Sequence, residues 1–192
     1  MRRSALLGAL SLALLLIAGC GGSKAPQFTG NAAPSVRAPN FALEDQSGKT
    51  ITVTSQRGHW LVVTFLYTHC PDVCPLIAAH LNGALTSAAG RRAQLRVIAV
   101  SVDPERDTLA AVRRYAVTHR LAPTFHWAIG SRAQLARVWR AYHVATQPGP
   151  KATVTHSTFE ILVDPQGKER LIYDQSLTTR QLTGDLAKLT AT

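Results

Sequence analysis

One stretch of the chain decides its fold: residues 60–75 read WLVVTFLYTHCPDVCP. The first eight residues are a continuous apolar and β-branched run, which is typical of a strand buried on both faces at the centre of a sheet. Pro75 is tolerated at the start of a helix but not inside one. The sequence therefore predicts a helix that begins at Pro75, with Cys74 as its N-cap and Cys70 in the loop before it.

The alternation of strands and helices continues along the chain. A small hairpin is expected within residues 41–53, and Pro165-Gln166-Gly167 marks the turn of a second hairpin. The other expected strands are 95–102, 125–129, 158–164 and 170–173, and the expected helices are 75–89, 106–119, 131–142 (with Ser131 as N-cap) and 179–189. This pattern predicts an α/β fold with a central, mostly parallel sheet, an antiparallel C-terminal hairpin and helices on both faces.

The N-terminus carries the pattern of an export signal. Arg2 and Arg3 supply positive charge, and the apolar run Ala5–Ala18 has the length of a signal h-region, too short to span a bilayer. Small residues precede Cys20, an arrangement that resembles the bacterial lipoprotein signal, in which the cysteine is acylated. An ordinary secretory leader is the alternative. We expect a lipoprotein signal peptide at 1–19, a flexible lipidated tether at 20–38 and one folded domain at 39–192.

Charge and length narrow the class of protein. The 192 residues suffice for one domain, and 21 Lys and Arg against 11 Asp and Glu give a net charge of +10. The basic residues are scattered and no aromatic residues are interleaved with them, so nucleic-acid binding is not expected. Solvated helix faces near an anionic membrane explain the charge, and we expect an extracytoplasmic protein anchored to a bacterial membrane by its lipid.

The cysteines indicate a chemically active pair rather than a structural disulfide. If Cys20 carries lipid, Cys70 and Cys74 remain as a pair outside the cytoplasm, where thiols can be oxidised. A thiolate at a helix N-terminus is favoured by the helix dipole, so at least one of the two should be unusually acidic. A disulfide between them would close only a short loop and stabilise little, so a purely structural disulfide is the weaker interpretation.

Four blocks of sequence carry a resemblance to a known family. They are YTHCPDVCP at 67–75, SVDPERDT at 101–108, TFHWAIG at 124–130 and HSTFEILVDPQG at 156–167. Together they closely resemble the Sco/SenC family of copper-binding, thioredoxin-like proteins. The resemblance implies a thioredoxin-like fold and copper delivery to the binuclear copper A centre of cytochrome c oxidase. It also implies that Cys70, Cys74 and His156 are the copper ligands.

The residues suit that metal on chemical grounds. Cu(I) prefers thiolates, and imidazole suits both Cu(I) and Cu(II), although the same donors also suit zinc. In thioredoxin-like folds the loop before the strand at 158–163 faces the cysteines and usually carries a cis-proline; residues 153–157 contain no proline, which leaves room for His156 as a ligand. Asp72 and Asp103 are candidates for an outer shell, with loop stabilisation and an Asp-Pro turn as the alternatives. His69 should point away from the pair.

Three functions remain open at this stage. A copper chaperone would pass copper to thiolates of the copper-bearing oxidase subunit or of another copper protein. A thiol-disulfide reductase would use Cys70 and Cys74 as a redox-active pair and keep a partner's copper-ligand cysteines reduced. A peroxidase would need an activating arginine near the nucleophile, and that pattern is missing. The CxxxC spacing, where disulfide oxidoreductases have two intervening residues, favours the metal.

Overall fold

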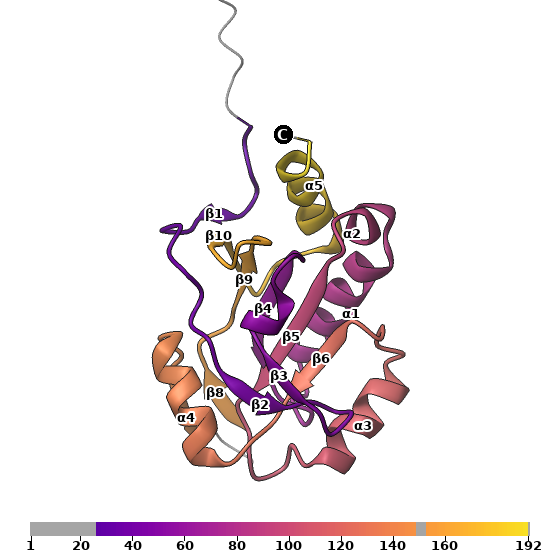
Figure 1. The fold of residues 1–192 in the computed structure, drawn as a ribbon. Coiled ribbons are helices and arrows are strands. Elements are labelled where there is room, and N and C mark those ends of the chain that lie inside the picture. The colour runs from indigo at the N-terminus through magenta and orange to yellow at the C-terminus, as the bar shows by residue number, and fades with distance from the viewer. Residues whose placement is uncertain (1–25, 149–152, 192) are drawn as a thin grey trace, which may run out of the picture.

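A six-stranded sheet organises the molecule, with its strands in the order β1-β10-β9-β4-β5-β6 (Figure 1). The computed structural model describes residues 26–148 and 153–191. The strands are β1 (Asn31–Ala32), β4 (Leu61–Leu66), β5 (Arg96–Ser101), β6 (Phe125–Ala128), β9 (Phe159–Val163) and β10 (Glu169–Asp174). β4, β5 and β6 run parallel, and the β9–β10 hairpin joins β4 in the antiparallel sense. The predicted α/β fold with an antiparallel C-terminal hairpin is confirmed.

Helices cover both faces of this sheet. They are α1 (Val73–Thr86), α2 (Ala88–Arg92), α3 (Leu109–Thr118), α4 (Arg132–Ala141) and α5 (Thr179–Leu189). α1 packs against α5, whereas α4 lies on the other face, where the ring of Phe65 is 5.5 Å from that of Tyr142. Ser131 caps α4 as predicted, since its hydroxyl accepts from the Gln134 amide at 3.3 Å.

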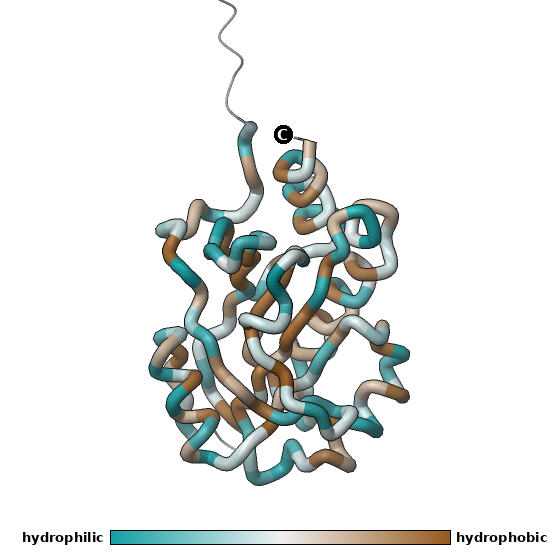
Figure 2. Tube along the Cα trace, in the orientation of Figure 1, coloured by the Kyte–Doolittle hydropathy of each residue, from teal (hydrophilic) through white to brown (hydrophobic). Residues whose placement is uncertain are grey.

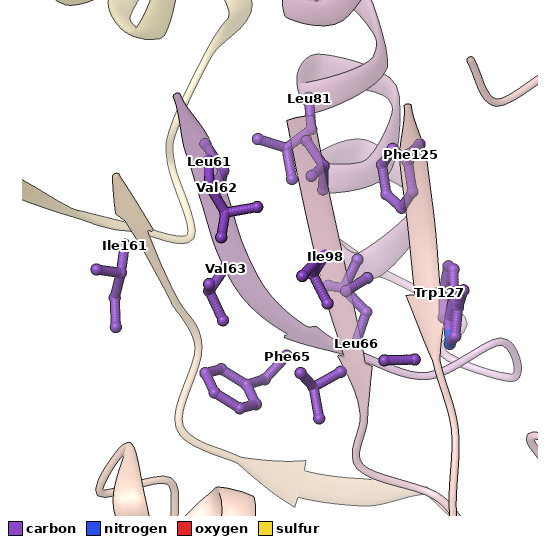
Figure 3. Packing of buried hydrophobic residues seen from close by; sticks show 14 of the residues in the cluster. Leu61, Val62, Val63, Phe65, Leu66, Leu81, Ile98, Phe125, Trp127 and Ile161 are labelled. Atoms are coloured by element: carbon purple, nitrogen blue, oxygen red, sulfur yellow. The ribbon is translucent and has the colours of Figure 1, made fainter. Parts of the chain in front are cut away.

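The core lies between the sheet and its helices. Every residue of β4 is buried, as the apolar run predicted, and Val62, Val63, Phe65 and Leu66 have no exposed surface. Figure 2 shows apolar residues along the inner strands. Figure 3 shows the apolar side chains of β4 beside Ile98, Phe125 and Trp127. The described residues thus form one core of their own, and a chain that begins at residue 21 keeps every described contact.

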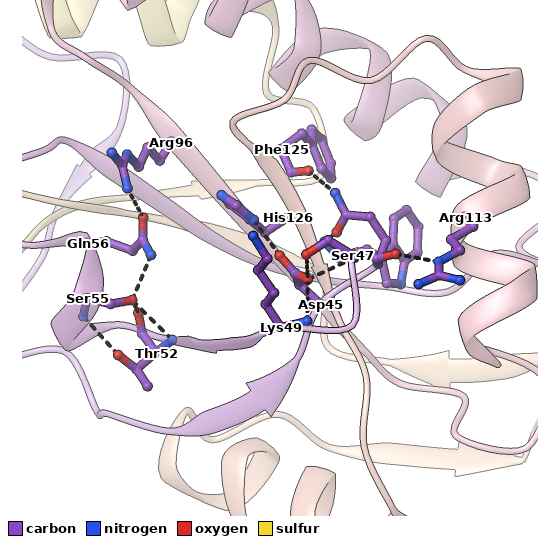
Figure 4. Close-up of polar contacts among 12 residues, drawn as sticks. Asp45, Ser47, Lys49, Thr52, Ser55, Gln56, Arg96, Arg113, Phe125 and His126 are labelled. Carbon is purple, nitrogen blue, oxygen red and sulfur yellow. Dashed lines mark hydrogen bonds and ion pairs between the residues drawn. The ribbon is translucent and has the colours of Figure 1, made fainter.

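The predicted N-terminal hairpin is present, and hydrogen bonds attach it to β6. It consists of β2 (Ala42–Glu44) and β3 (Thr50–Thr52), followed by the 3₁₀ turn η1 (Thr54–Gln56). Asp45 pairs with the His126 imidazole at 3.0 Å, and Gln46 bonds the Phe125 carbonyl and the Trp127 amide, each at 2.7 Å (Figure 4). These bonds hold the hairpin against the sheet.

The first helix differs from the prediction at both ends. It begins at Val73 with Asp72 as N-cap, so Cys74 lies inside the first turn and Pro75 follows it. Pro75 is tolerated there because the first amides of a helix have no partner within the helix. The predicted helix 75–89 also breaks at Ser87, which ends α1 and caps α2 by accepting from the Gly90 amide. A Cβ atom on Gly90 would lie 2.0 Å from the Ala84 carbonyl oxygen, so glycine permits this break.

The predicted tether ends earlier than residue 38. Its first six residues, 20–25, lie outside the described part of the chain, as does the signal peptide. The Thr29 and Gly30 amides donate to the Asp185 carboxylate at 2.9 and 3.0 Å, and β1 pairs with β10. The prediction of a free tether is therefore wrong for residues 29–38. Short-range composition does not reveal it, because the buried partner Asp185 is about 155 residues away.

A short strand ends at His156 in a separate ribbon. β7 (Thr146–Pro148) pairs antiparallel with β8 (Val154–His156), and residues 149–152, which join the two strands, lie outside the described part. Within residues 26–148 and 153–191, no helix is long and apolar enough to cross a membrane.

Candidate metal centre

Cys70 and Cys74 come together where β4 gives way to α1. The Cys74 amide donates to the Cys70 sulfur at 3.4 Å, so the first turn of the helix holds one thiol over the other. Cys74 is fully buried and Cys70 is half-buried. Both are free thiols in this structure, so one sulfur is accessible and its partner lies behind it.

The pKa values of the two thiols are shifted in opposite directions. The Cys74 thiol donates to the Cys70 sulfur, and mainly for this reason the pKa of Cys70 falls to about 5, although burial opposes the shift. Backbone amides of Asp72 and Cys74 and the Tyr67 hydroxyl add to the effect. The same hydrogen bond, together with burial, raises the pKa of the Cys74 thiol far above its ordinary value. The predicted acidic thiol is therefore Cys70, in the loop before the helix.

Tyr67 links the cysteines to the histidine, and no pattern in the sequence singled it out. It directly follows β4, is 3% exposed, and its hydroxyl bonds the Cys70 sulfur while accepting the Val154 amide at 3.4 Å. Its ring meets the His156 imidazole edge-on at 6.0 Å, and the Arg106 guanidinium lies 5.9 Å above it. One side chain thus contacts both halves of the predicted ligand set.

A hydrogen bond fixes His156 in the tautomer whose Nε2 can act as a metal ligand. Its Nδ1 lies 2.9 Å from the Ser157 carbonyl oxygen, which requires a proton on Nδ1 and leaves the Nε2 lone pair available. Burial lowers the pKa of the imidazole, so it is neutral at neutral pH. It borders a surface cavity of about 340 Å³ together with Thr146, Gln147 and Ser157.

The three predicted ligands share one end of the molecule but do not form a closed ligand set. Among the residues that the structure describes, no three His, Cys, Asp or Glu side chains lie close enough to hold a metal ion. His156 does interact electrostatically with the Cys70 thiolate from across the Tyr67 ring. Joint coordination therefore requires β8 to approach the cysteine loop.

The two aspartates predicted as outer-shell groups differ in their surroundings. Asp72 is exposed and its carboxylate makes no capping bond to α1. Asp103 is buried but binds Arg106 at 2.5 Å. Their predicted roles stay predictions.

Asp107, which falls in the first turn of the helix predicted at 106–119, supports the cysteine loop instead. It accepts from the Thr68 amide at 2.9 Å, the Thr68 hydroxyl at 2.6 Å and the Ser101 hydroxyl at 2.6 Å. Burial raises its pKa, whereas these bonds favour its charged form. The signal available in the sequence was an acid directly before the N-cap residue Thr108, three residues after Pro104 of the Asp-Pro pair.

Two of the predicted residues remain, His69 and Cys20. His69 is exposed and its Nδ1 contacts the Thr68 hydroxyl at 3.0 Å, on the neighbouring residue. Cys20, the predicted lipidation site, lies outside the described residues.

Fold and site together define a class: a thioredoxin-like α/β protein with a CxxxC pair at the start of a helix and a histidine at the same end of the molecule. The SCO1/SenC family model matches residues 30–191, and the chain belongs to this family. It is 31% identical over 156 residues to bovine "Protein SCO2 homolog, mitochondrial", covering 78% of this chain and 58% of that protein. It is also 31% identical over 154 residues to "Protein SenC" of Rhodobacter capsulatus, covering 78% and 68%.

Solved structures agree with the fold. "Structure of Bradyrhizobium japonicum ScoI with copper bound" superposes with a TM-score of 0.69 at 31% identity, covering 80% of this chain and 99% of that one. The solution structure of apo Sco1 from Thermus thermophilus gives a TM-score of 0.71 at 29% identity, covering 85% and 97%. The chain spans about half to three-fifths of the mitochondrial relatives it matches.

Proposed function

We propose that this protein binds copper through Cys70, Cys74 and His156 and delivers it to the binuclear copper A centre of cytochrome c oxidase. The observation that carries the proposal is the acidic, half-buried Cys70 thiol, held beside Cys74 and linked through Tyr67 to a histidine whose Nε2 is available. The family membership and the copper-bound relative at 31% identity support it.

The donor set suits a cargo that must be held and then released. Two thiolates bind Cu(I) strongly, and one imidazole makes the site usable for Cu(II) as well. Copper would displace the proton that Cys74 now shares with Cys70, since metal binding requires deprotonated thiols. Because Cys70 and His156 both border solvent, an acceptor thiolate can replace one donor at a time.

The proposed location is the outer side of a bacterial membrane. Residues 1–19 would act as the lipoprotein signal, and acylated Cys20 would anchor the domain close to membrane-embedded acceptors. Its partner would be the copper-bearing oxidase subunit or another copper protein. Mass spectrometry of the membrane-extracted protein tests the anchor, since an acylated residue 20 must appear as the mature N-terminus.

Copper binding is tested by loading a chain that begins at residue 21 with Cu(I) and Cu(II). We expect about one copper per chain, sulfur-to-copper(II) charge-transfer absorption, and binding weakened at least about tenfold in His156→Ala. His69→Ala is the matched control, because this exposed histidine adjoins Cys70 and should bind copper as the unmodified chain does. Zinc competition is run in parallel. Unchanged copper affinity in His156→Ala would remove the histidine from the site.

A thiol-disulfide reductase is the second candidate, and the opposite acidities of the thiols favour it. Cys70 would attack a partner disulfide as the thiolate, and Cys74 would then resolve the mixed disulfide; the partner gains two electrons and this pair becomes a disulfide. The test is reduction of an oxidised copper-A peptide by the copper-free protein. Fast reduction that persists in His156→Ala, together with weak copper binding, would make this the main function.

A further inference from the structure

The acidic residues of this chain are mostly hidden. All eleven Asp and Glu lie in the described part, and seven are buried: Asp45, Asp103, Asp107, Glu160, Asp164, Glu169 and Asp185. Eleven minus seven leaves four exposed acids: Glu44, Asp72, Glu105 and Asp174. The surface is therefore more basic than the composition alone suggests.

The four exposed acids lie toward the end of the sheet that carries the cysteines. Glu44 forms an isolated β-bridge with Ile129, just beyond the end of β6. Asp72 is the N-cap residue of α1, and Glu105 follows the end of β5. Asp174 ends β10 opposite Phe159, at the start of β9. β9 runs antiparallel to β4, so its start lies beside the end of β4.

The opposite end of the sheet, where β4 and β5 begin, carries exposed basic residues. We call this group the basic pole: Arg37, Arg57, Arg91, Arg92 and Lys168. Arg57 precedes β4, whereas Arg91 and Arg92 end α2, directly before β5. Lys168 lies in the β9–β10 turn, where its backbone forms an isolated antiparallel β-bridge with Arg37. None of the exposed acids lies at this end.

The chain also leaves the domain toward this end. Gln27 accepts from Lys188 near the end of α5 at 2.6 Å, and α5 packs against α2 (Figure 1). Figure 1 shows α2 and α5 at one end of the molecule and α3, α4 and β8 at the other. The six residues 20–25 can span at most about 20 Å, so anything attached at Cys20 is held close to the basic pole.

We propose that the basic pole binds the headgroups of anionic phospholipids, so that the domain sits on the membrane with its cysteine end facing away. Five exposed cations at one end of the sheet, with no exposed acid at that end, match a negatively charged bilayer, and the short connection to residue 20 brings the two together. The headgroup contact stands on the charges alone, whereas the orientation rests on the lipid anchor proposed above. The consequence is that the metal centre is presented to acceptors that project from the membrane.

Vesicle sedimentation tests this inference with a chain that begins at residue 21 and carries no lipid. Vesicles of phosphatidylcholine with and without phosphatidylglycerol are compared at low and high salt. We expect binding only to the anionic vesicles and release by salt, because screening shortens the range of the attraction. Equal binding to both kinds of vesicle would overturn the proposal.

Two triple variants of equal charge locate the contact. Arg57→Gln/Arg92→Gln/Lys168→Gln removes three cations of the basic pole and should weaken vesicle binding at least about tenfold. Arg114→Gln/Arg137→Gln/Arg140→Gln removes three exposed cations from α3 and α4 and should retain binding within about twofold. Circular dichroism and copper stoichiometry confirm that both variants fold.

Two results contradict the inference. Equal weakening in both triple variants would mean that net charge alone drives the binding. Binding to polyglutamate but not to phosphatidylglycerol vesicles would assign the pole to an acidic protein. Neither result bears on copper binding, which is measured separately.

Discussion

Cys70 and Cys74 are the same residue type four positions apart, yet the fold gives them different chemistry. Cys74 faces the core and keeps its proton, whereas Cys70 collects hydrogen bonds from Cys74, two backbone amides and Tyr67. Each of these donors favours the thiolate. The reactive group is therefore Cys70, and its environment rather than its identity makes it reactive.

The reactivity of Cys70 should depend on pH accordingly. Its alkylation by iodoacetamide should rise with a midpoint near pH 5, because its pKa is lowered to about 5, and should fall as pH drops below that value and the thiolate is protonated. Cys74→Ala removes the largest cause and should move the midpoint up toward the ordinary thiol value of about 8.5. Rates are followed by mass spectrometry. A midpoint near that ordinary value in the unmodified chain would contradict the assignment.

Asp107 should be a structural support of the cysteine loop. Asp107→Ala leaves the Thr68 amide and the Ser101 hydroxyl without their acceptor, which should lower the free energy of unfolding by about 2–4 kcal/mol. Glu105→Ala is the control: this exposed acid on the same loop pairs only with exposed Arg132, so its removal should cost less than about 0.5 kcal/mol. Urea unfolding measures both. Equal losses would show that Asp107 has no special role.

At the scale of elements, β9 carries an unexpected carboxylic acid in the core. Glu160 is fully buried, lies opposite Thr64 of β4 and accepts its hydroxyl at 3.3 Å, while its Oε2 has no partner among the described residues. Burial raises the pKa of this carboxyl to about 8. The folded protein therefore holds a proton that the unfolded chain releases at much lower pH.

This proton makes stability depend on pH. Between about pH 4.5 and pH 8 the unfolded chain binds fewer protons at Glu160 than the folded protein does, so the free energy of unfolding should fall as pH rises, by a few kcal/mol in all. Glu160→Gln should remove most of this fall, whereas Glu44→Gln, an exposed control, should leave it unchanged. Urea unfolding at several pH values decides. A parallel pH profile in Glu160→Gln would contradict the assignment.

At the scale of the whole molecule, the basic pole and the cysteine pair lie at opposite ends of the sheet. The candidate metal centre and the exposed acids lie where the parallel strands end, and the basic pole lies where they begin. Parallel strands place their carboxyl ends together at one edge, where reactive groups gather in open α/β sheets. The β7–β8 ribbon at that edge must move toward Cys70 for His156 to share a metal ion with the two thiols.

Copper should therefore stabilise the whole protein. A ligand that binds only the folded state adds stability, about 4 kcal/mol when its free concentration is a thousand times its Kd, and a chelator should reverse the gain. His156→Ala should retain only part of the gain, because it removes a donor and the closure of β8 with it. Calorimetry with and without Cu(I) measures the shift. Equal stabilisation of both proteins would show that His156 does not close on the metal.

The sequence by itself determined the α/β order, the buried central strand, the C-terminal hairpin and the position of the CxxxC pair at the start of a helix. These follow from local apolar periodicity, capping residues and proline, which act over a few residues. Only the tertiary structure decided that Cys70 is the acidic thiol, that Asp107 holds its loop, that Tyr67 joins it to His156 and that residues 29–38 pack on the domain. Each of these rests on burial or on contacts between distant segments, which short-range patterns do not record.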